Sequence, residues 1–414
     1  MARLAFTNAT VFDSASGSMR PGATVVVEGG TIADVDFGAP RVDDAEIHDL
    51  AGKFLLPGLI DCHVHVTAVH HDVLRLAMQP PSLITAQAKD VLEGMLARGF
   101  TTVRDAGGAD FGLQEAVERG LFAGPRLYIS GWPLSQTGGH ADARPKGAST
   151  MFCTCAGLGL TGAIADGVGE VRKAAREQLR NGANQIKIMA GGGVASPTDP
   201  IDGTQYSLEE LRAICEEAAA ANTYAMAHAY SPASIARAVR SGVRSIEHGN
   251  LLDEAAAREM KQAGAFLVPT LATYAALADE GAKLGWSDEM YAKLERVRDR
   301  GVEAIRVARS EGVPVAFGTD LLGRMHERQA SEFELRSTVM APAEILKSAT
   351  SVAAAVLGQS GRLGVIAKGA LADLIVLDGD PTADLGALTA PGRGPRAVLK
   401  GGRFVDLPQT RRVR

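Results

Sequence analysis

The sequence lacks the features of membrane, secreted and nucleic-acid-binding proteins. Four cysteines among 414 residues are too few and too irregularly spaced for a disulfide framework. No segment reaches the roughly 20 apolar residues that a membrane-spanning helix needs. The formal net charge is -5, and lysine and arginine form no basic block, so nothing favours a nucleic-acid partner. We therefore expect a globular protein with a small-molecule substrate, no nucleic acid and no membrane.

The N-terminus also lacks a clear secretory signal. "MARLAFTNATVFDS" has only a short apolar run and passes directly into alternating, strand-like residues. We therefore expect a cytoplasmic location, although a chain already trimmed of its signal would look the same.

One pair of cysteines, Cys153 and Cys155 in "FCTCAG", has a spacing that could ligate a metal. No second pair of cysteines or histidines follows at the spacing of a zinc site. Two small residues in a long loop are the better interpretation of this pair.

Both ends of the chain show the alternation of apolar and polar residues that is typical of β-strands. The expected strands cover residues 3–8, 23–29, 31–36, 373–378 and 397–405. Between them, short apolar segments alternate with longer helical segments, which predicts βα units and a parallel sheet. The predicted fold class is α/β, a (β/α)8 TIM barrel with a small β-sandwich domain built from both termini. We place the barrel at residues 57–359 and the two parts of the small domain at residues 1–56 and 360–414.

Helix boundaries are well marked within the barrel region. Ser207 and Glu210 form a capping box at the start of one helix. Ser231 is the expected N-cap of the next helix, and Gly242 lies just past its end. The segments at 132–168, 190–206 and 270–290 are expected to be loops that line the substrate pocket and select the substrate.

Ionisable residues fall at the ends of the expected barrel strands. In such a strand alternate residues face inward and the others face the helix layer. In "GLIDCHVHV", Asp61, His63 and His65 share one face, and the apolar residues between them share the other. We infer the same inward position for one ionisable residue in each of four further strands. These residues are Lys187 in "IKIM", His228 in "YAMAH", His248 in "SIEHG" and Asp320 in "VPVAFGTD".

The number of these groups indicates a metal site. A single histidine at a strand end is more often a satisfied core residue than a ligand. Leaving Asp61 aside, the six groups at or near the strand ends cannot all be buried unpaired, because each would cost roughly several kcal/mol. A metal removes this penalty, and the C-terminal ends of barrel strands are where this fold carries its catalytic residues.

Several of these segments resemble the amidohydrolase superfamily. The similar segments are "PGLIDCHVH", the "IK" strand, the strand-end histidines, "FGTD", "MAPAEILKSATSVAAAVLG" and "GRLGVIAKGALADLIVLD", and together they cover essentially the whole chain. Within the superfamily, "TGGHAD", "IKIMAGGG" and "AHAY…GVRSIEHG" look most like the imidazolonepropionase-related branch. That branch includes Xaa-Pro and Xaa-Arg dipeptidases and ochratoxinase-like amidohydrolases with two metals.

The resemblance implies two divalent metal ions, with zinc as the expected metal. His63, His65 and Asp320 would hold one ion, and His228 and His248 the other. Lys187 would be carboxylated and bridge the two ions, since a carbamate is an anionic ligand whereas a free ammonium would repel them. The other interpretation of this residue is a lysine that reaches solvent at the mouth of the barrel. Imidazolonepropionases proper resemble a one-metal pattern without this lysine.

The resemblance also implies a reaction. A hydroxide that bridges the metals would attack the amide bond of a dipeptide or an N-acyl amino acid, a class that includes ochratoxin-type aryl amides. Asp320 would take the proton and pass it to the leaving nitrogen. His140 in "TGGHAD" would bind the oxyanion, and Tyr230 would bind the same oxyanion or the substrate carboxylate. Asp61 is expected to orient its neighbours rather than to bind a metal.

Other interpretations remain open at this stage. The same site could hydrolyse a cyclic amide or a thiocarbamate, and a homologue without catalysis would keep the fold alone. His140 and Tyr230 could also be ordinary loop residues. His70 and His71 in "AVHHDV" suggest a third metal, but a loop or helix start is the better interpretation. A homo-oligomer is also left open, because no pattern in the sequence tests it.

Overall fold

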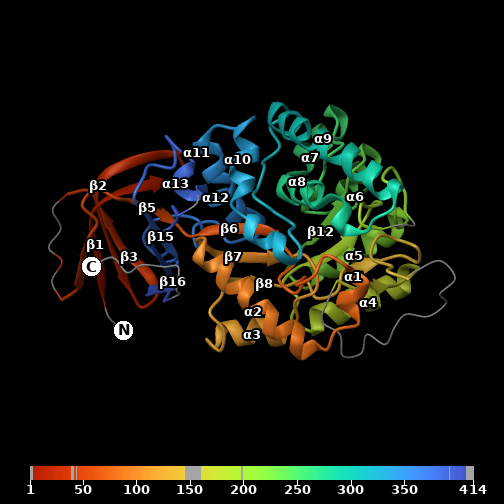
Figure 1. Cartoon of the computed structure of the whole chain (residues 1–414), viewed down its shortest axis with the longest axis horizontal. Helices are drawn as coiled ribbons and strands as arrows, with labels where there is room; N and C mark the ends of the chain where they lie inside the picture. Colours follow the sequence, from red (N-terminus) through yellow and green to blue (C-terminus); the bar gives the residue numbers. More distant parts are fainter. Residues whose placement is uncertain are drawn as a thin grey trace.

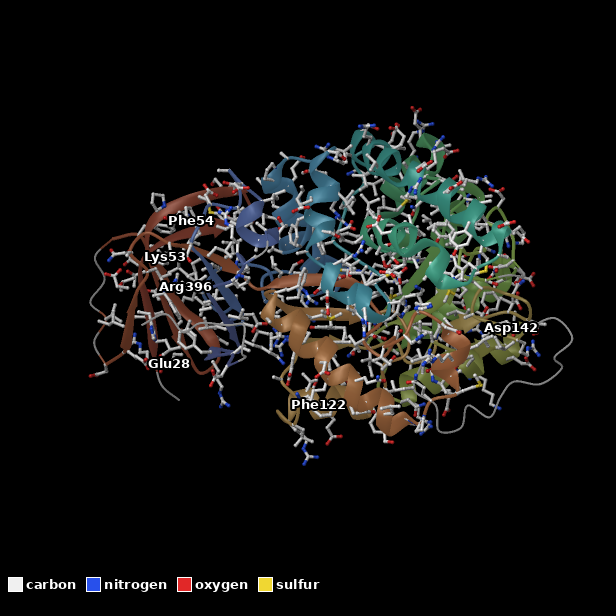
Figure 2. The ribbon with its side chains drawn as sticks, viewed as in Figure 1. Glu28, Lys53, Phe54, Phe122, Asp142 and Arg396 are labelled. Atoms are coloured by element: carbon white, nitrogen blue, oxygen red, sulfur yellow. The ribbon has the colours of Figure 1, made fainter. Side chains whose placement is uncertain are left out.

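The computed structural model describes residues 3–38, 42, 44–144, 160–196, 199–390 and 392–406. Figure 1 shows two parts, a sheet formed by the two ends of the chain and a barrel formed by the middle. The labelled Glu28 and Phe54 lie at the sheet end, and Asp142 lies at the opposite end of the molecule (Figure 2). The CxC pair, Cys153 and Cys155, lies outside the described residues.

The terminal sheet joins strands from both ends of the chain. Its strands are β1 (Leu4–Asp13), β2 (Ser18–Glu28), β3 (Thr31–Asp36), β4 (Glu46–Asp49), β5 (Phe54–Pro57), β15 (Leu374–Leu377), β16 (Ala397–Lys400) and β17 (Arg403–Phe404). They pair in the order β17-β16-β15-β5-β1-β2-β3, with β4 on β1. β15 pairs antiparallel with β5, which brings the two halves together. The small β domain from both termini is therefore confirmed, and its strands belong to one hydrogen-bonded sheet.

The barrel strands form two parallel sheets. One contains β6 (Leu59–Val64), β7 (Phe100–Asp105) and β8 (Arg126–Tyr128). The other contains β11 (Ile186–Met189), β12 (Ala225–Ala229), β13 (Ser245–His248) and β14 (Phe266–Val268), with the short β9 (Leu134–Ser135) and β10 (Ala163–Ile164) at its edge. The last two strands lie in the long segment at 132–168, the described part of which is therefore not all loop.

An extended segment closes the barrel in the place of the eighth strand. The sequence predicts a strand over residues 313–320, whereas the structure has only one isolated bridge there, between Leu267 and Val315. The segment nevertheless bonds to both sheets: Ala316 N donates to Leu267 O at 2.9 Å, and Cys62 N donates to Phe317 O at 2.8 Å. The two sheets also meet between β8 and β11, where Asn184 N donates to Ile129 O at 2.7 Å.

Helices cover the outer face of the barrel. They are α1 (Val73–Ala77), α2 (Pro81–Ala97), α3 (Phe111–Glu118), α4 (Val168–Arg180), α5 (Leu208–Ala220), α6 (Pro232–Arg240), α7 (Glu254–Ala263), α8 (Leu271–Glu280), α9 (Asp288–Ser310), α10 (Ser331–Ser337), α11 (Pro342–Ser348), α12 (Ser351–Val356) and α13 (Gly386–Thr389), with 3-10 turns η1 (Gly281–Leu284) and η2 (Gly323–Arg328). The capping box of α5 and the Ser231 cap of α6 are both present. Within the described residues, no helix is long and apolar enough to cross a membrane.

The segment at 270–290 corrects one expectation. It is not a loop, because α8, η1 and the start of α9 together occupy most of it, and α8 buries Leu271, Tyr274 and Leu277. These three residues recur at every third position in "LATYAALADE", a spacing that fits one side of a helix.

The alternation predicted for the barrel strands holds on their outer faces. Ile186 and Ile188 belong to the apolar layer that also contains Leu211 and Ile214 of α5. Cys62 belongs to a cluster with residues of α12. Because these apolar side chains face the helices, the residues between them face the interior of the barrel.

Candidate active site

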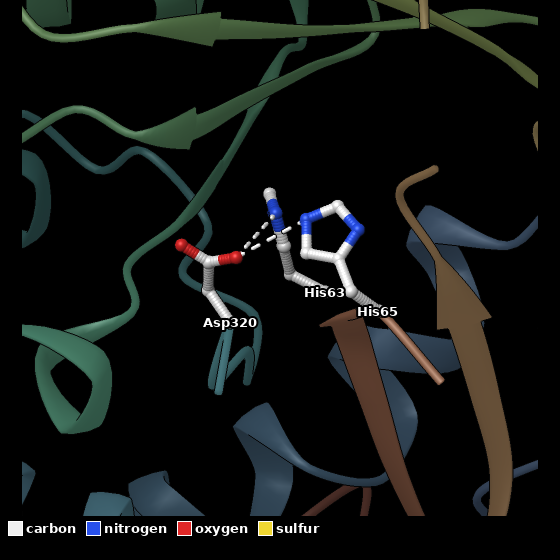
Figure 3. A group of neighbouring side chains, drawn as sticks. All are labelled: His63, His65 and Asp320. Atoms are coloured by element: carbon white, nitrogen blue, oxygen red, sulfur yellow. Dashed lines mark ion pairs between the residues drawn. The ribbon is translucent and has the colours of Figure 1, made fainter. Parts of the chain in front are cut away.

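Three of the predicted ligands meet at the C-terminal end of β6. His63 lies on β6, His65 lies just beyond it, and Asp320 ends the segment that closes the barrel. One potential ligand atom from each lies within 4.8 Å of the others. Asp320 Oδ1 is 3.5 Å from His63 Nε2 and 3.2 Å from His65 Nε2. Figure 3 shows the two rings and the carboxylate turned toward one another.

Both histidines are held by their other nitrogen. His63 Nδ1 lies 2.7 Å from Glu247 Oε2, and His65 Nδ1 lies 2.8 Å from Gly107 O. A carbonyl or a carboxylate only accepts, so each Nδ1 donates, and in the neutral form of each ring Nε2 then carries the lone pair. His63 Nε2 is buried without a hydrogen-bond partner among the described residues. This is the arrangement of metal-binding histidines, and the donor set therefore fits a divalent metal ion.

His228 and His248 lie beside this group. The ring centroid of His248 is 4.7 Å from that of His63 and 4.7 Å from that of His228. Burial is the main cause that lowers the pKa of both histidines well below the ordinary value of 6.5. Both rings are therefore neutral, and a neutral imidazole is the form that binds a metal.

His248 faces the interior of the barrel, but the alternation of side chains along the strand does not explain this. Ile246 packs in the helix layer, and Glu247 points into the barrel toward His63. Strict alternation would therefore send His248 outward, so alternation is the wrong reason for the inward position inferred from "SIEHG". His248 has φ of 69°, and this left-handed conformation, uncommon outside glycine, turns its ring inward.

Lys187 is almost completely buried, with 1% of its surface exposed. Burial lowers its pKa from 10.5 to about 8, and the nearby charges of Glu247 and Asp320 oppose that change. A lysine that reaches solvent does not fit this burial. A depressed pKa favours the neutral amine, which is the form that can react with carbon dioxide.

Asp320 stays ionised despite its burial. Burial by itself would raise the pKa of its carboxyl, but His63 and His65 lower it well below the ordinary value of 3.8. Its φ of 56° is a second left-handed conformation at the site. The carboxylate is thus held as an anion among three imidazoles.

His140 lies over the ring of His228. The two rings stack with centroids 4.4 Å apart, and His140 Nδ1 is 3.4 Å from Asp199 Oδ2. A Cβ on Gly193 would come within 1.8 Å of the His140 ring. The "AGGGV" run therefore lets the backbone pass close to the site, because glycine has no Cβ. Gly192 O in the same run lies 3.0 Å from His228 Nε2.

Tyr230 also faces the site. Its ring centroid is 4.8 Å from that of His228, and its hydroxyl lies 2.8 Å from the hydroxyl of Tyr274. Burial raises the pKa of both tyrosines, so their hydroxyls are neutral and can donate hydrogen bonds.

Two further predictions concern residues next to the HxH motif. Asp61 accepts hydrogen bonds from Thr319 Oγ1 at 2.6 Å and from Gln329 Nε2 at 2.9 Å, and it also accepts one from His63 N. These contacts suit a residue that orients its neighbours. His70 lies in the loop before α1, where its Nδ1 accepts from Asp72 N.

Several residues of the site were not identified from the sequence. They are Arg104, Asp199, Glu247, Tyr274 and Asp105, which accepts from the backbone N of Val66 next to His65. A signal existed for two of them, since Arg104 and Glu247 are charged residues that directly follow an apolar residue within short strands. Asp199 and Tyr274 carry no such pattern, because the first lies in a loop and the second lies on α8.

Known proteins resemble this chain in sequence and in fold. The sequence pattern of the Amidohydrolase family matches residues 54–405. A prolidase crystallised with N-methylphosphonate-L-proline is 49% identical, with a TM-score of 0.95 over 98% of this chain and 100% of that one. A Xaa-Pro dipeptidase structure with bound methionine is 28% identical, with a TM-score of 0.88 over 98% of this chain and 100% of that one.

A curated relative extends the comparison to a different amide. The ochratoxinase of Aspergillus niger is 35% identical over 368 residues, which are 86% of this chain and 76% of that protein. The predicted resemblance to the branch that contains ochratoxinases and Xaa-Pro dipeptidases is confirmed. The chain belongs to the amidohydrolase family and is a hydrolase that acts on amide bonds.

Proposed function

We propose that this amidohydrolase uses two metals to release the C-terminal amino acid from a dipeptide or an N-acyl amino acid, with Xaa-Pro dipeptides as the first substrates to test. The observation that carries the proposal is the group of His63, His65 and Asp320, with Lys187 and two further histidines buried around it. The similarity to a prolidase with a phosphonate of proline supports proline as the leaving residue.

The donor set suggests how two ions would be held. His63, His65 and Asp320 would bind one, and His228 and His248 would bind the other. Lys187, carboxylated on its amine, would bridge them, and we expect zinc because histidine and carboxylate ligands suit it. When bound, such ions polarise the amide carbonyl and lower the pKa of the attacking water.

The residues around this centre would handle protons and charge. Asp320 is an anion at the site, so it can accept the proton of the attacking water and pass it to the leaving nitrogen. His140 and the neutral hydroxyl of Tyr230 can donate hydrogen bonds to the tetrahedral oxyanion.

The surroundings of Tyr230 favour an apolar leaving residue. Tyr230 belongs to an apolar cluster with Tyr274, Leu321 and Met325, and Trp286 packs against the same cluster. The relationship to ochratoxinase supports a second candidate, an ochratoxin-type amide between an aromatic acyl group and an amino acid.

A substrate panel on zinc-restored protein tests the proposal. We expect hydrolysis of Xaa-Pro dipeptides and of N-acyl amino acids with apolar side chains, with weaker hydrolysis of arginine and lysine derivatives. No hydrolysis across a dipeptide and N-acyl amino acid library would make the substrate class wrong. Lys187→Ala with normal activity and two metals per chain would make the site assignment wrong.

A further inference from the structure

A buried ion pair lies directly beneath the candidate metal centre. Arg104 on β7 and Glu247 on β13 are both completely buried, and Arg104 Nη2 donates to Glu247 Oε1 at 2.9 Å. Two charges in the barrel interior need a reason beyond stability, because a buried ion pair often gives no advantage over apolar residues of similar volume.

The contacts of the pair converge on His63. Glu247 Oε2 accepts from His63 Nδ1 at 2.7 Å, and Glu247 Oε1 also accepts from Ser245 Oγ at 2.6 Å. Arg104 Nε donates to Cys62 O, the carbonyl just before His63, at 2.7 Å. The pair therefore holds both the ring of His63 and the backbone that carries it.

These contacts decide which nitrogen of His63 is available. Because a carboxylate only accepts, Glu247 keeps the hydrogen on Nδ1 and leaves the lone pair on Nε2. Nε2 is the atom that faces Asp320. Partners of this kind fix the tautomer and the orientation of a metal-binding histidine.

We propose that Glu247, held in place by Arg104 and Ser245, is a positioning residue that fixes His63 in the tautomer and orientation that bind metal. The inference rests on the proposed function, since it requires a metal ion at His63. It predicts that the loss of Glu247 weakens metal binding for a reason separate from any loss of stability.

A second buried pair in the same barrel provides a matched control. Glu332 and Arg336 on α10 are also completely buried, with Arg336 Nε 2.7 Å from Glu332 Oε1. Arg336 donates to Pro269 O, and Glu332 accepts from Ala272 N. Among the described residues this pair makes no hydrogen bond to a candidate ligand, so its loss should lower stability and leave the bonds to His63 in place.

The experiment compares zinc binding and stability in four full-length variants. At the first pair they are the single variant Glu247→Gln and the double variant that combines Arg104→Met and Glu247→Gln. At the control pair they are the single variant Glu332→Gln and the double variant that combines Arg336→Met and Glu332→Gln. Zinc affinity is measured by competition with a chelator, zinc per chain by elemental analysis, and the melting temperature on zinc-free protein. The ring-nitrogen NMR signals of His63 in zinc-free protein report its tautomer.

We expect Glu247→Gln to weaken the binding of zinc by about 10- to 100-fold. The double variant at 104 and 247 should regain melting temperature, because no charge remains unpaired, but not zinc affinity. The variants at 332 and 336 should change melting temperature alone. Should both Glu247 variants fail to fold, Ser245→Ala removes one bond to Glu247 and one from Arg104 without leaving a charge unpaired, and it should weaken zinc binding in the same direction.

The inference would be overturned if a folded Glu247 variant bound zinc with wild-type affinity. If neither Glu247 variant folds, wild-type zinc affinity in Ser245→Ala would overturn it. An unchanged His63 tautomer in Glu247→Gln would do the same. Failure of the proposed function looks different: wild-type protein itself would then bind no zinc.

Discussion

Lys187 illustrates how burial of a single residue prepares a reaction. Its pKa is lowered to about 8, so the fraction of neutral amine increases as pH rises through that value. Carbon dioxide reacts with the neutral amine to give a carbamate and a proton. We therefore expect bound carbon dioxide and the second zinc equivalent to increase together as pH rises through about 8 in bicarbonate buffer. Native mass spectrometry and elemental analysis measure both, and Lys187→Gln should show neither change.

The same pKa can be checked without carbon dioxide or metal. The folded pKa of about 8 lies below the ordinary 10.5, so between these values the unfolded chain binds more protons than the folded one. The free energy of unfolding of zinc-free protein should rise as pH increases from about 8 toward 10.5, by about 3 kcal/mol in all. Lys187→Met should lack this rise in chemical denaturation. The same rise in that variant would assign it to another group.

At the scale of elements, the loop after β11 shapes the site through its backbone. A Cβ on Gly193 would come within 1.8 Å of the His140 ring, so Gly193→Ala must displace that ring. If His140 binds the oxyanion, kcat should fall by about 100-fold, the loss expected when one oxyanion donor is removed. KM, zinc content and melting temperature should change little. Steady-state kinetics on the best dipeptide measure the effect.

Gly169, in the first turn of α4, is the control for this substitution, since a Cβ there meets nothing within 4 Å. Gly169→Ala should keep kcat and raise stability by roughly 0.5–1 kcal/mol through helix propensity. Normal kcat in Gly193→Ala would remove His140 from the mechanism.

Helix caps with strong local signals were predicted well, whereas two longer segments were not. The capping box at Ser207 and the cap at Ser231 depend on residues within three positions of each other, so they can be read locally. The segment at 270–290 was expected to be a loop but contains α8, although the apolar spacing of this helix was visible in the sequence. The closing segment at 313–320 has a strand-like sequence but only one bridge, because its backbone bonds to two different sheets rather than along one ladder.

At the scale of the whole molecule, the candidate ligands connect much of the barrel. They come from β6, β11, β12, β13 and the closing segment. Bound metal would hold these segments together, so zinc should stabilise the folded protein, by about 4 kcal/mol when free zinc is 1,000 times its Kd. Thermal unfolding with zinc, and with a chelator, measures the effect.

Hydrogen exchange would show where this stabilisation acts. We expect zinc to increase protection in β6, β12 and β13, whose ends carry ligands. The terminal sheet serves as the internal control, since β1, β2 and β3 carry none of them. Equal protection of both parts would contradict a metal held at the mouth of the barrel.

The boundaries at residues 56/57 and 359/360, the cytoplasmic location and self-association stay predictions.

The sequence by itself determined the parts of the site that depend on neighbouring residues. Alternation in "DCHVH" and "IKIM" placed His63, His65 and Lys187 on the inner faces of their strands, because side-chain direction repeats every two residues. Only the tertiary structure decided what each residue meets there. Glu247 bonds to His63 across 184 positions of sequence, and a left-handed backbone turns His248 inward. Such contacts depend on how distant strands are brought together in the closed barrel, which no local pattern records.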